Sequence, residues 1–184
     1  MDCIYRRREN DWGDIYRDLD SGMIDKYDYK IFNHDSMILH ITDKKFKKNI
    51  EKILSEYREE NIEYERIFID FVLNKYDEAY YFYLFNEEKI IGMCKGCNRN
   101  KKIEIVNVFI IKEFRRMNLG FFMMSNLIKF LKKQNIIKIG LSVEKSNLPA
   151  LNLYKKLNFE IECEKYEECF GETYIYMYYP IKEN

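Results

Sequence analysis

The sequence lacks an excess of charge of either sign and lacks any long apolar run. Lysine plus arginine and aspartate plus glutamate each number 31, so bulk charge draws the chain to neither nucleic acid nor an anionic membrane. No apolar stretch approaches the roughly 18 residues that a membrane-spanning helix needs. No apolar segment follows the basic cluster Arg6-Arg7-Arg8, as it would in a signal peptide. We therefore expect a cytoplasmic protein that binds neither nucleic acid nor membrane.

Histidine is scarce and cysteine is odd in number, which limits metal and disulfide chemistry. The two histidines have no metal-ligand spacing, and the five cysteines are expected to be reduced thiols. Cys94 and Cys97 form a CxxC pair, with Cys163 and Cys169 as conceivable further ligands. However, Cys94 lies in an apolar run typical of a strand, whereas a zinc-binding CxxC pair usually lies on a tight turn. We expect no metal site.

The hydrophobic pattern predicts a single domain that mixes strands and helices. With 184 residues, 47% of them hydrophobic, the chain can bury a sizeable core, and no repeat or low-complexity linker divides it. In the first part, the pattern predicts a strand at Met37–Thr42, a helix at Lys44–Glu60 with Asp43 as N-cap, and a strand at Glu65–Phe71. The apolar stripe of this helix indicates core packing.

Three closely spaced strands are predicted next. They cover Ala79–Phe85, Lys89–Lys95 and Lys101–Ile111, with turns over Asn86–Glu88 and Asn98–Asn100. Strands joined by such short connections form a β-meander.

The last part of the chain alternates helix and strand. After Gly120, apolar residues recur on one helical face, with lysines on the other. These apolar residues are Phe121, Met124, Leu127, Ile128 and Leu131. The elements predicted after this helix are a strand at Lys138–Val143, a helix at Leu148–Leu157, and a closing hairpin of Phe159–Lys165 and Thr173–Pro180.

Two motifs carry the functional signal. The first is Arg115-Arg116-Met117-Asn118-Leu119-Gly120, which joins a strand to the start of a helix, where backbone N–H groups and arginines would make a site for a pyrophosphate. Taken alone, it could equally be a basic surface turn. The second motif begins 27 residues after Gly120 and reads Asn147-x-x-Ala150-x-x-Leu153-Tyr154-x-x-Leu157-Asn158-Phe159. Together the two motifs favour an acyl-CoA enzyme.

The two motifs resemble those of the GNAT superfamily of acyl-CoA-dependent N-acyltransferases. Its cofactor loop reads Arg/Gln-x-x-Gly-x-Gly/Ala, and its later helix reads Asn-x-x-Ala-x-x-Leu-Tyr-x-x-x-Gly-Phe. Asn118 and Asn158 stand where the family usually has glycine, and asparagine tolerates the positive φ that we expect at both positions. Gly120 is retained where the backbone comes closest to the phosphates, so a side chain there would intrude on the pyrophosphate rather than on the core.

The resemblance implies an α/β (α+β) fold of the GNAT type. Its central sheet is mixed and mostly antiparallel, is flanked by helices, and contains a splayed pair of parallel strands that binds the pantetheine arm. Residues 1–184 would form one domain, in which residues 1–78 make the acceptor-side region and residues 79–184 the cofactor-binding core.

The resemblance also implies acetyl-CoA as the acyl donor. The edge of the strand before the loop would bind the pantetheine, and the loop would bind the phosphates. Asn147 would contact the pantetheine or merely cap its helix, and both roles are compatible. The implied cofactor-binding residues are Val108, Phe109, Ile110, Arg115, Arg116, Met117, Asn118, Leu119, Gly120, Phe121, Asn147 and Tyr154.

An acid and a base follow from the same resemblance. The run Glu104-Ile105-Val106 is similar to the strand that carries the general base in the histone-acetylating branch, and apolar surroundings would suit Glu104 to that role. The alternative is a solvent-facing strand glutamate. Asn107 could replace Glu104 through a water relay. Tyr154 matches the general acid that protonates the departing thiolate.

The leading hypothesis is therefore an N-acetyltransferase that acts on a primary amine of a small molecule or a protein. A non-catalytic CoA-binding sensor or interaction module is the alternative, and a longer acyl chain is a third reading. The acceptor is not indicated by the sequence, and homodimer formation is left open.

Overall fold

The computed structural model describes residues 4–6, 27–33, 44–60, 78–168 and 170–181. The predicted strands at Met37–Thr42 and Glu65–Phe71, and the predicted N-cap Asp43, lie outside these residues. Within them, we find no helix with the length and apolar character needed to cross a membrane.

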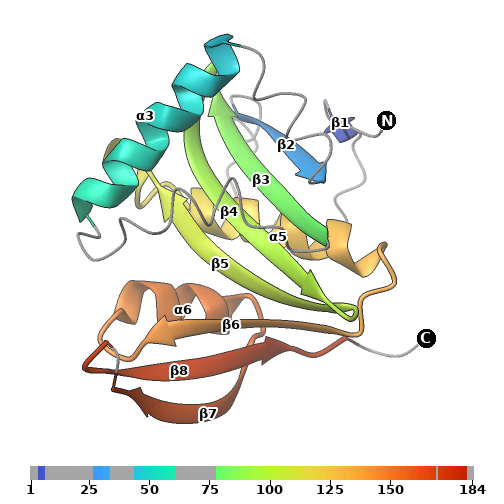
Figure 1. Cartoon of the computed structure of the whole chain (residues 1–184), viewed down its shortest axis with the longest axis vertical. Helices are drawn as coiled ribbons and strands as arrows, with labels where there is room; N and C mark the ends of the chain where they lie inside the picture. Colours follow the sequence, from blue (N-terminus) through green and yellow to red (C-terminus); the bar gives the residue numbers. More distant parts are fainter. Residues whose placement is uncertain (1–3, 7–26, 34–43, 61–77, 169, 182–184) are drawn as a thin grey trace.

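The described residues form an eight-stranded sheet with the strand order β1-β2-β3-β4-β5-β6-β8-β7 (Figure 1). Every neighbouring pair is antiparallel except β5 with β6. The strands are β1 (Ile4–Arg6), β2 (Tyr27–Asn33), β3 (Glu78–Asn86), β4 (Lys89–Arg99), β5 (Lys102–Ile110), β6 (Lys138–Glu144), β7 (Glu160–Glu167) and β8 (Glu172–Tyr179). This mixed, mostly antiparallel sheet confirms the predicted fold class.

The predicted β-meander corresponds to β3, β4 and β5, with one turn displaced. β4 runs to Arg99, beyond its predicted end at Lys95. The turn that follows consists of Asn100 and Lys101, with φ of 53° and 63°. Two successive residues with positive φ match the twist of a tight β-hairpin.

The only parallel pairing among the described strands is short. β5 pairs with β6 from Lys102 against Lys138 to Ile105 against Leu141, and the pairing stops there although both strands continue. The two strands therefore separate towards their C-terminal ends, which confirms the predicted splay.

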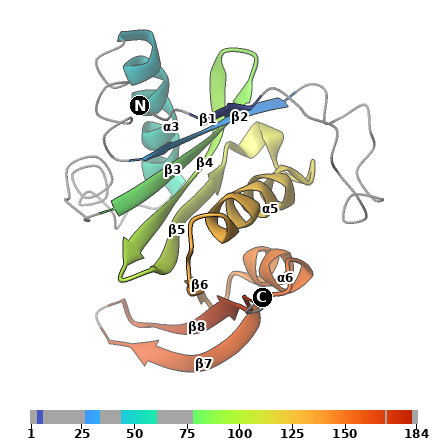
Figure 2. The ribbon, with the colours of Figure 1, turned by 90° about the vertical axis from the view of Figure 1, so that its right-hand side faces the viewer.

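Helices cover both faces of the sheet (Figure 2). Helix α3 (Lys44–Glu60) lies on one face, where the ring of Tyr57 meets the ring of Phe109 edge-on at 5.1 Å. Helices α5 (Leu119–Lys132) and α6 (Leu148–Lys156) lie on the other, where Tyr80 of β3 meets Phe130 of α5 at 5.2 Å. We call these the α3 face and the α5 face.

Helix α5 is buried more widely than a single apolar face predicts. The predicted core residues are buried, and so are Phe122, Met123, Ser125 and Asn126. Asn126 satisfies its side-chain amide within the helix by donating to the carbonyl of Phe122 at 2.8 Å. The broad burial arises because the sheet covers one side of α5 and α6 contacts another.

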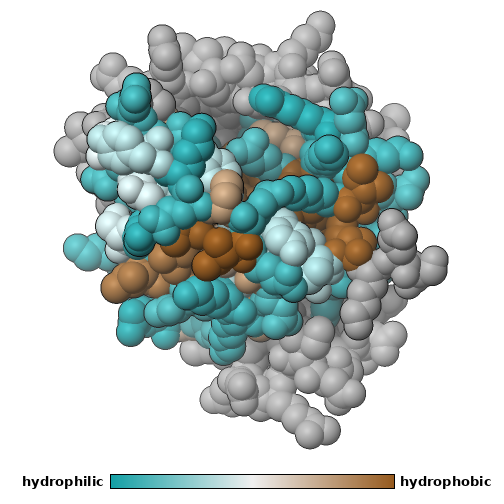
Figure 3. Space-filling model, turned by 90° about the horizontal axis from the view of Figure 1, so that it is seen from below, coloured by the Kyte–Doolittle hydropathy of each residue, from teal (hydrophilic) through white to brown (hydrophobic). Residues whose placement is uncertain are grey.

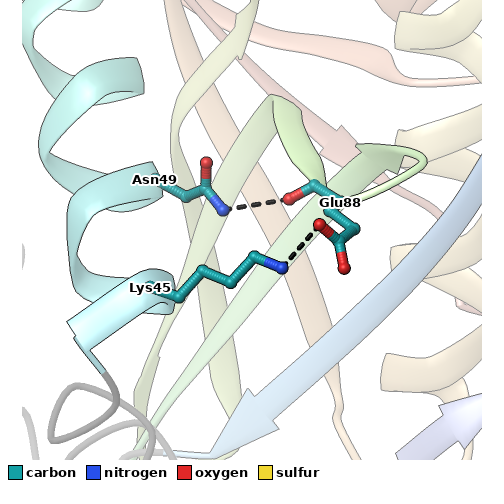
Figure 4. A network of polar contacts seen from close by, with 3 residues as sticks. All are labelled: Lys45, Asn49 and Glu88. Carbon is teal, nitrogen blue, oxygen red and sulfur yellow. Dashed lines mark hydrogen bonds and ion pairs between the residues drawn. The ribbon is translucent and has the colours of Figure 1, made fainter.

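Helix α3 is fixed to the hairpin between β3 and β4 (Figure 4). The Nζ of Lys45 lies 2.5 Å from a carboxylate oxygen of Glu88, and the side-chain amide of Asn49 donates to the carbonyl of Glu88 at 2.9 Å. The exposed ion pair contributes little energy by itself. The buried Ile53 and its neighbours hold the helix on the sheet, and the two polar contacts tie its first two turns to the turn between β3 and β4.

β7 is the edge strand at the lower end of the sheet. Its side chains are exposed over almost the whole strand, including Ile161 at 53%. The molecule seen from below shows apolar groups interspersed with hydrophilic ones (Figure 3). Glu160, Glu164 and Lys165 place charges along this edge, and charged edge residues discourage pairing with another strand.

Candidate active site

A β-bulge turns the C-terminal part of β5 away from β6. Met93 of β4 pairs with Phe109 and Lys95 with Val106, so β5 has one residue more than β4 between these pairs. Asn107 adopts φ of 55° at this point. A bulge with a left-handed residue bends its strand and increases the local twist. Asn107 lies two residues after Ile105, the last residue of β5 that pairs with β6.

The loop after β5 has the backbone that the first motif predicts. Arg116 and Asn118 have φ of 65° and 59°, and Asn118 is the N-cap of α5. The first turn of α5 contains no acidic residue, and its leading N–H groups have no partner within the helix. A helix start of this kind attracts anions. The expected positive φ at Asn118 is confirmed, and the same holds for Asn158 with φ of 64°.

Arg115 is engaged with the end of β5. Its Nε donates to the carbonyl of Ile110 at 2.8 Å, and its guanidinium carbon lies 5.2 Å from the ring centroid of Phe109. The predicted phosphate contact of Arg115 stays a prediction. The bracing of the β5 edge is a role that the sequence did not indicate. Arg116 is exposed beside it.

Gly120 has a protein neighbour as well as the expected phosphate. A Cβ at this position would lie 3.3 Å from Cδ2 of Leu153 in α6, and the φ of Gly120 is not left-handed. The expectation that a side chain here would spare the core is therefore wrong. Glycine at this position lets α5 and α6 approach closely.

Helix α6 begins at Asn147, whose Oδ1 accepts a hydrogen bond from the N–H of Ala150 at 3.2 Å. This confirms the capping role, and the contact with pantetheine stays a prediction. Pro149 lies in the first turn, where its missing N–H costs nothing.

Tyr154 is buried in α6 with 6% of its surface exposed. Burial raises the pKa of its phenol above the ordinary value of 10.0, and the nearby thiol of Cys94 and phenol of Tyr57 raise it further. Cys94 pairs with Phe82, which stacks on Tyr29 on the α5 face, whereas Tyr57 belongs to α3. Tyr154 is thus influenced by groups from both faces of the sheet, as expected for a side chain where β5 and β6 separate.

Glu104 lies on the α3 face of β5. It is the cross-strand partner of Cys97 in β4 and of Gly140 in β6. Its carboxylate contributes to the raised pKa of Cys97 and of Tyr176, so it lies near both groups. Its side chain is exposed, so the expectation of apolar surroundings is wrong. Its role as a base stays a prediction.

The sequence also matches a known protein family. The sequence model of the Acetyltransferase (GNAT) family matches residues 47–159, more than half of the 184-residue chain. The chain belongs to this family. The match includes α5 and α6 and the two motifs from which the resemblance was inferred.

Relatives of this GNAT chain match it over part of its length. An N-alpha-acetyltransferase of Sulfurisphaera tokodaii is 32% identical over 83 residues, 44% of this chain and 50% of that protein. The chain thus spans about half the length of the curated relatives it matches. The ribosomal-protein-S18-alanine N-acetyltransferase from Escherichia coli is 25% identical with a TM-score of 0.52, over 56% of this chain and 70% of that chain.

A third protein shares the fold. The Bacillus subtilis acetyltransferase in complex with CoA has a TM-score of 0.54 and 17% identity, over 64% of this chain and 85% of that chain. At this identity the likeness concerns the fold alone.

Two residues near the GNAT site were missed by reasoning from the sequence. The Nζ of Lys156 lies 4.9 Å from the ring centroid of Phe121 at the start of α5, which adds a cation beside the predicted phosphate site. Tyr57 of α3 lies beside Phe109 and Tyr154. Lys156 falls within the second motif and could have been noticed there. Tyr57 had no such signal, because its apolar spacing indicated core packing.

The CxxC pair lies in a strand and not on a turn. Cys94 and Cys97 are both buried, and because they are three residues apart in β4 they point to opposite faces. Burial raises the pKa of both thiols, which disfavours the thiolate that a metal needs. Among the described residues, no cluster of His, Cys, Asp and Glu has a metal-binding arrangement.

Proposed function

We propose that this chain is an acetyl-CoA-dependent N-acetyltransferase that acts on a primary amine. The observation that carries the proposal is the coincidence of three features at one point of the sheet. These are the bulge at Asn107, the end of the parallel pairing at Ile105, and the buried phenol of Tyr154. Membership of the GNAT family supports the same reaction.

The residues around this point suit the two ends of acetyl-CoA. The unpaired edge of β5 at Val108, Phe109 and Ile110 would bind the pantetheine, with Asn147 at the other side. The phosphates would lie at the start of α5, against the N–H groups of Met117 to Phe121. Arg115, Arg116 and Lys156 would supply positive charge there. Acetyl-CoA itself supplies an acetyl group activated as a thioester.

Glu104 and Tyr154 would carry out the proton transfers. Glu104 on the α3 face would accept a proton from the attacking amine, either directly or through a water held by Asn107. Tyr154, reaching the separated strands from the α5 face, would donate its proton to the departing sulfur. Because burial keeps this phenol neutral, it remains a donor throughout the ordinary pH range.

The leading acceptor is the α-amine of a protein N-terminus. The support is that the matched part of the chain is 32% identical to an N-alpha-acetyltransferase and 25% identical to an enzyme named for an alanine of ribosomal protein S18. A primary amine on a small molecule is the alternative acceptor, because it would attack the thioester in the same way. The acceptor would approach from the α3 face, where Glu104 and Tyr57 lie.

The test measures thiol release from acetyl-CoA by the full chain. One arm uses peptides with a free α-amine, a second uses the same peptides with a blocked N-terminus, and a third uses small primary amines. We expect release with the free peptides alone, with mass spectrometry locating the acetyl group on the α-amine. Release only with small amines would overturn the protein acceptor. No release in any arm, while acetyl-CoA still raises the melting temperature, would overturn the enzyme and favour the binding module.

A further inference from the structure

Residue 140, in the middle of β6, is a glycine. Neither its backbone conformation nor the packing around it requires the absence of a side chain. Its φ is not left-handed, and a Cβ there would meet only the carbonyl oxygen of Met177, at an ordinary 3.4 Å. Pairing continues through Gly140 without a bulge on both sides, to β5 and to β8. A glycine inside a strand weakens it, and where no bulge or bend is present it often marks a close approach by a ligand.

The neighbours of Gly140 connect it to the proposed acceptor side. In one row across the sheet, Glu104 of β5, Gly140 of β6 and Tyr178 of β8 are successive cross-strand partners, so they share the α3 face. In the next row towards the separated strand ends lie Ser142 and Tyr176. Gly140 is partly exposed although its strand has a neighbour on either side.

The tyrosines beside Gly140 are held in place by glutamates. The phenol of Tyr176 donates to Oε1 of Glu167 at 2.5 Å, and that of Tyr178 donates to Oε2 of Glu160 at 2.6 Å. The hydrogen bond to Glu167 is the main reason that the pKa of Tyr176 is raised to about 12. Two fixed, neutral rings therefore border a position that has no side chain of its own.

Charged groups surround this position with both signs. The carboxylates of Glu104, Glu160 and Glu167 lie around it, with Lys165 2.9 Å from Glu167. Lys138 lies 5.8 Å from the ring centroid of Tyr178 and forms an ion pair with a further carboxylate, that of Glu162. Because these carboxylates outnumber the two lysines, the surroundings disfavour an acidic side chain. The aromatic borders favour an uncharged one.

We propose that Gly140 leaves room for the first side chain of the acceptor, which would lie between Glu104 and the rings of Tyr176 and Tyr178. This inference rests on the proposed function, because it assumes an α-amine presented to Glu104. The acceptor class is an N-terminus whose first residue carries an uncharged side chain. Gly140 is then a specificity-determining residue.

The test fills the position and asks which acceptors are lost. Gly140→Ala and Gly140→Val are compared with the unaltered chain, using peptides that differ only in a first residue of glycine, alanine or methionine. We expect Gly140→Val to raise KM for the methionine peptide by roughly 10–200-fold, the range for a lost apolar fit, with kcat nearly unchanged. The glycine peptide should change by less than about threefold, and Gly140→Ala should give a smaller shift of the same sign.

The control is Glu164→Val, which introduces the same side chain at an exposed position of β7 on the α5 face, away from the row of Glu104, Gly140 and Tyr178. It should leave the ranking of the peptides unchanged. Equal losses for all three peptides in Gly140→Val would overturn the inference, and so would an unchanged ranking. If Gly140→Val fails to fold, the ranking in Gly140→Ala decides. An unaltered chain that acetylates none of the peptides would overturn the protein acceptor first, and this inference with it.

Discussion

Gly120 of α5 and Leu153 of α6 lie in contact, because a Cβ on Gly120 would come within 3.3 Å of Cδ2 of Leu153. One residue belongs to the proposed phosphate loop and the other to the helix that carries Tyr154. The spacing of the two helices therefore depends on the absence of a side chain at position 120. We expect substitutions at Gly120 to combine two effects, weaker cofactor binding and overpacking against Leu153, which a paired substitution can separate.

Gly120→Val should abolish the rise in melting temperature that acetyl-CoA produces by binding the folded state. The unliganded protein should also be destabilised, by about 1–3 kcal/mol, because the added side chain overpacks against Leu153. Adding Leu153→Ala should recover part of that stability without restoring acetyl-CoA binding. Thermal denaturation with and without acetyl-CoA measures both effects. Normal binding by Gly120→Val would show that the loop is not the phosphate site.

Two substitutions of Asn147 can distinguish its role as the helix cap from its proposed role in cofactor binding. Asn147→Ala should cost about 0.5–2 kcal/mol, because the N–H of Ala150 loses its acceptor. Asn147→Asp keeps an acceptor for the cap but removes the amide N–H that pantetheine would use. We expect Asn147→Asp to retain stability and to bind acetyl-CoA more weakly, as measured by calorimetry. Equal affinity in Asn147→Asp and the unaltered chain would limit Asn147 to its cap.

Glu104→Gln keeps the size of the side chain but cannot accept the proton of the amine. If Glu104 is the base, kcat near neutral pH should fall by roughly 10²–10⁴-fold, with acetyl-CoA affinity unchanged. Glu162→Gln is the control, since Glu162 is an exposed glutamate of β7 whose contact is an ion pair with Lys138. Full activity of Glu104→Gln would move the search for the base to Asn107 with a water, or to Glu144 or Glu172.

Tyr154→Phe removes only the hydroxyl group and should lower kcat. The pKa of this phenol is raised by burial, so the proton is held more tightly than in an exposed tyrosine and is still present at alkaline pH. The pH–rate profile between about pH 6 and 9 should therefore keep its shape in Tyr154→Phe while its height falls. An alkaline limb that disappears in the variant would instead show that Tyr154 titrates within that range.

Local patterns in the sequence predicted the cofactor side well. The two motifs predicted the loop, both helices that meet at Gly120, and the left-handed backbone at Asn118 and Asn158. These features depend on caps, glycine spacing and helical periodicity, which are properties of short segments. Their roles in binding and catalysis stay predictions, as do the two-part division of the domain, the cytoplasmic location and any homodimer.

Features set by neighbouring elements were not predictable in the same way. The exposure of Glu104 depends on what covers the α3 face. β2 was overlooked although Tyr27-Asp28-Tyr29-Lys30-Ile31 alternates large and charged residues and could have been predicted. The continuation of β4 through Gly96 was missed because glycine and asparagine indicated a turn. The contact of Tyr57 with Phe109 joins residues far apart in the sequence. For Glu104, the end of β4 and the contact of Tyr57 with Phe109, packing outweighed local preference.

The brief parallel pairing of β5 with β6 has a mechanical consequence. Among the described strands, β1 to β5 and β6 to β8 form two antiparallel halves, and the ladder that joins them spans only Lys102–Ile105 and Lys138–Leu141. A ligand lying along the unpaired end of β5 would act as a substitute strand and extend that ladder. A ligand that fills the gap between β5 and β6 would then couple the two halves of the sheet. Amide hydrogen exchange should therefore slow together at the C-terminal ends of both strands.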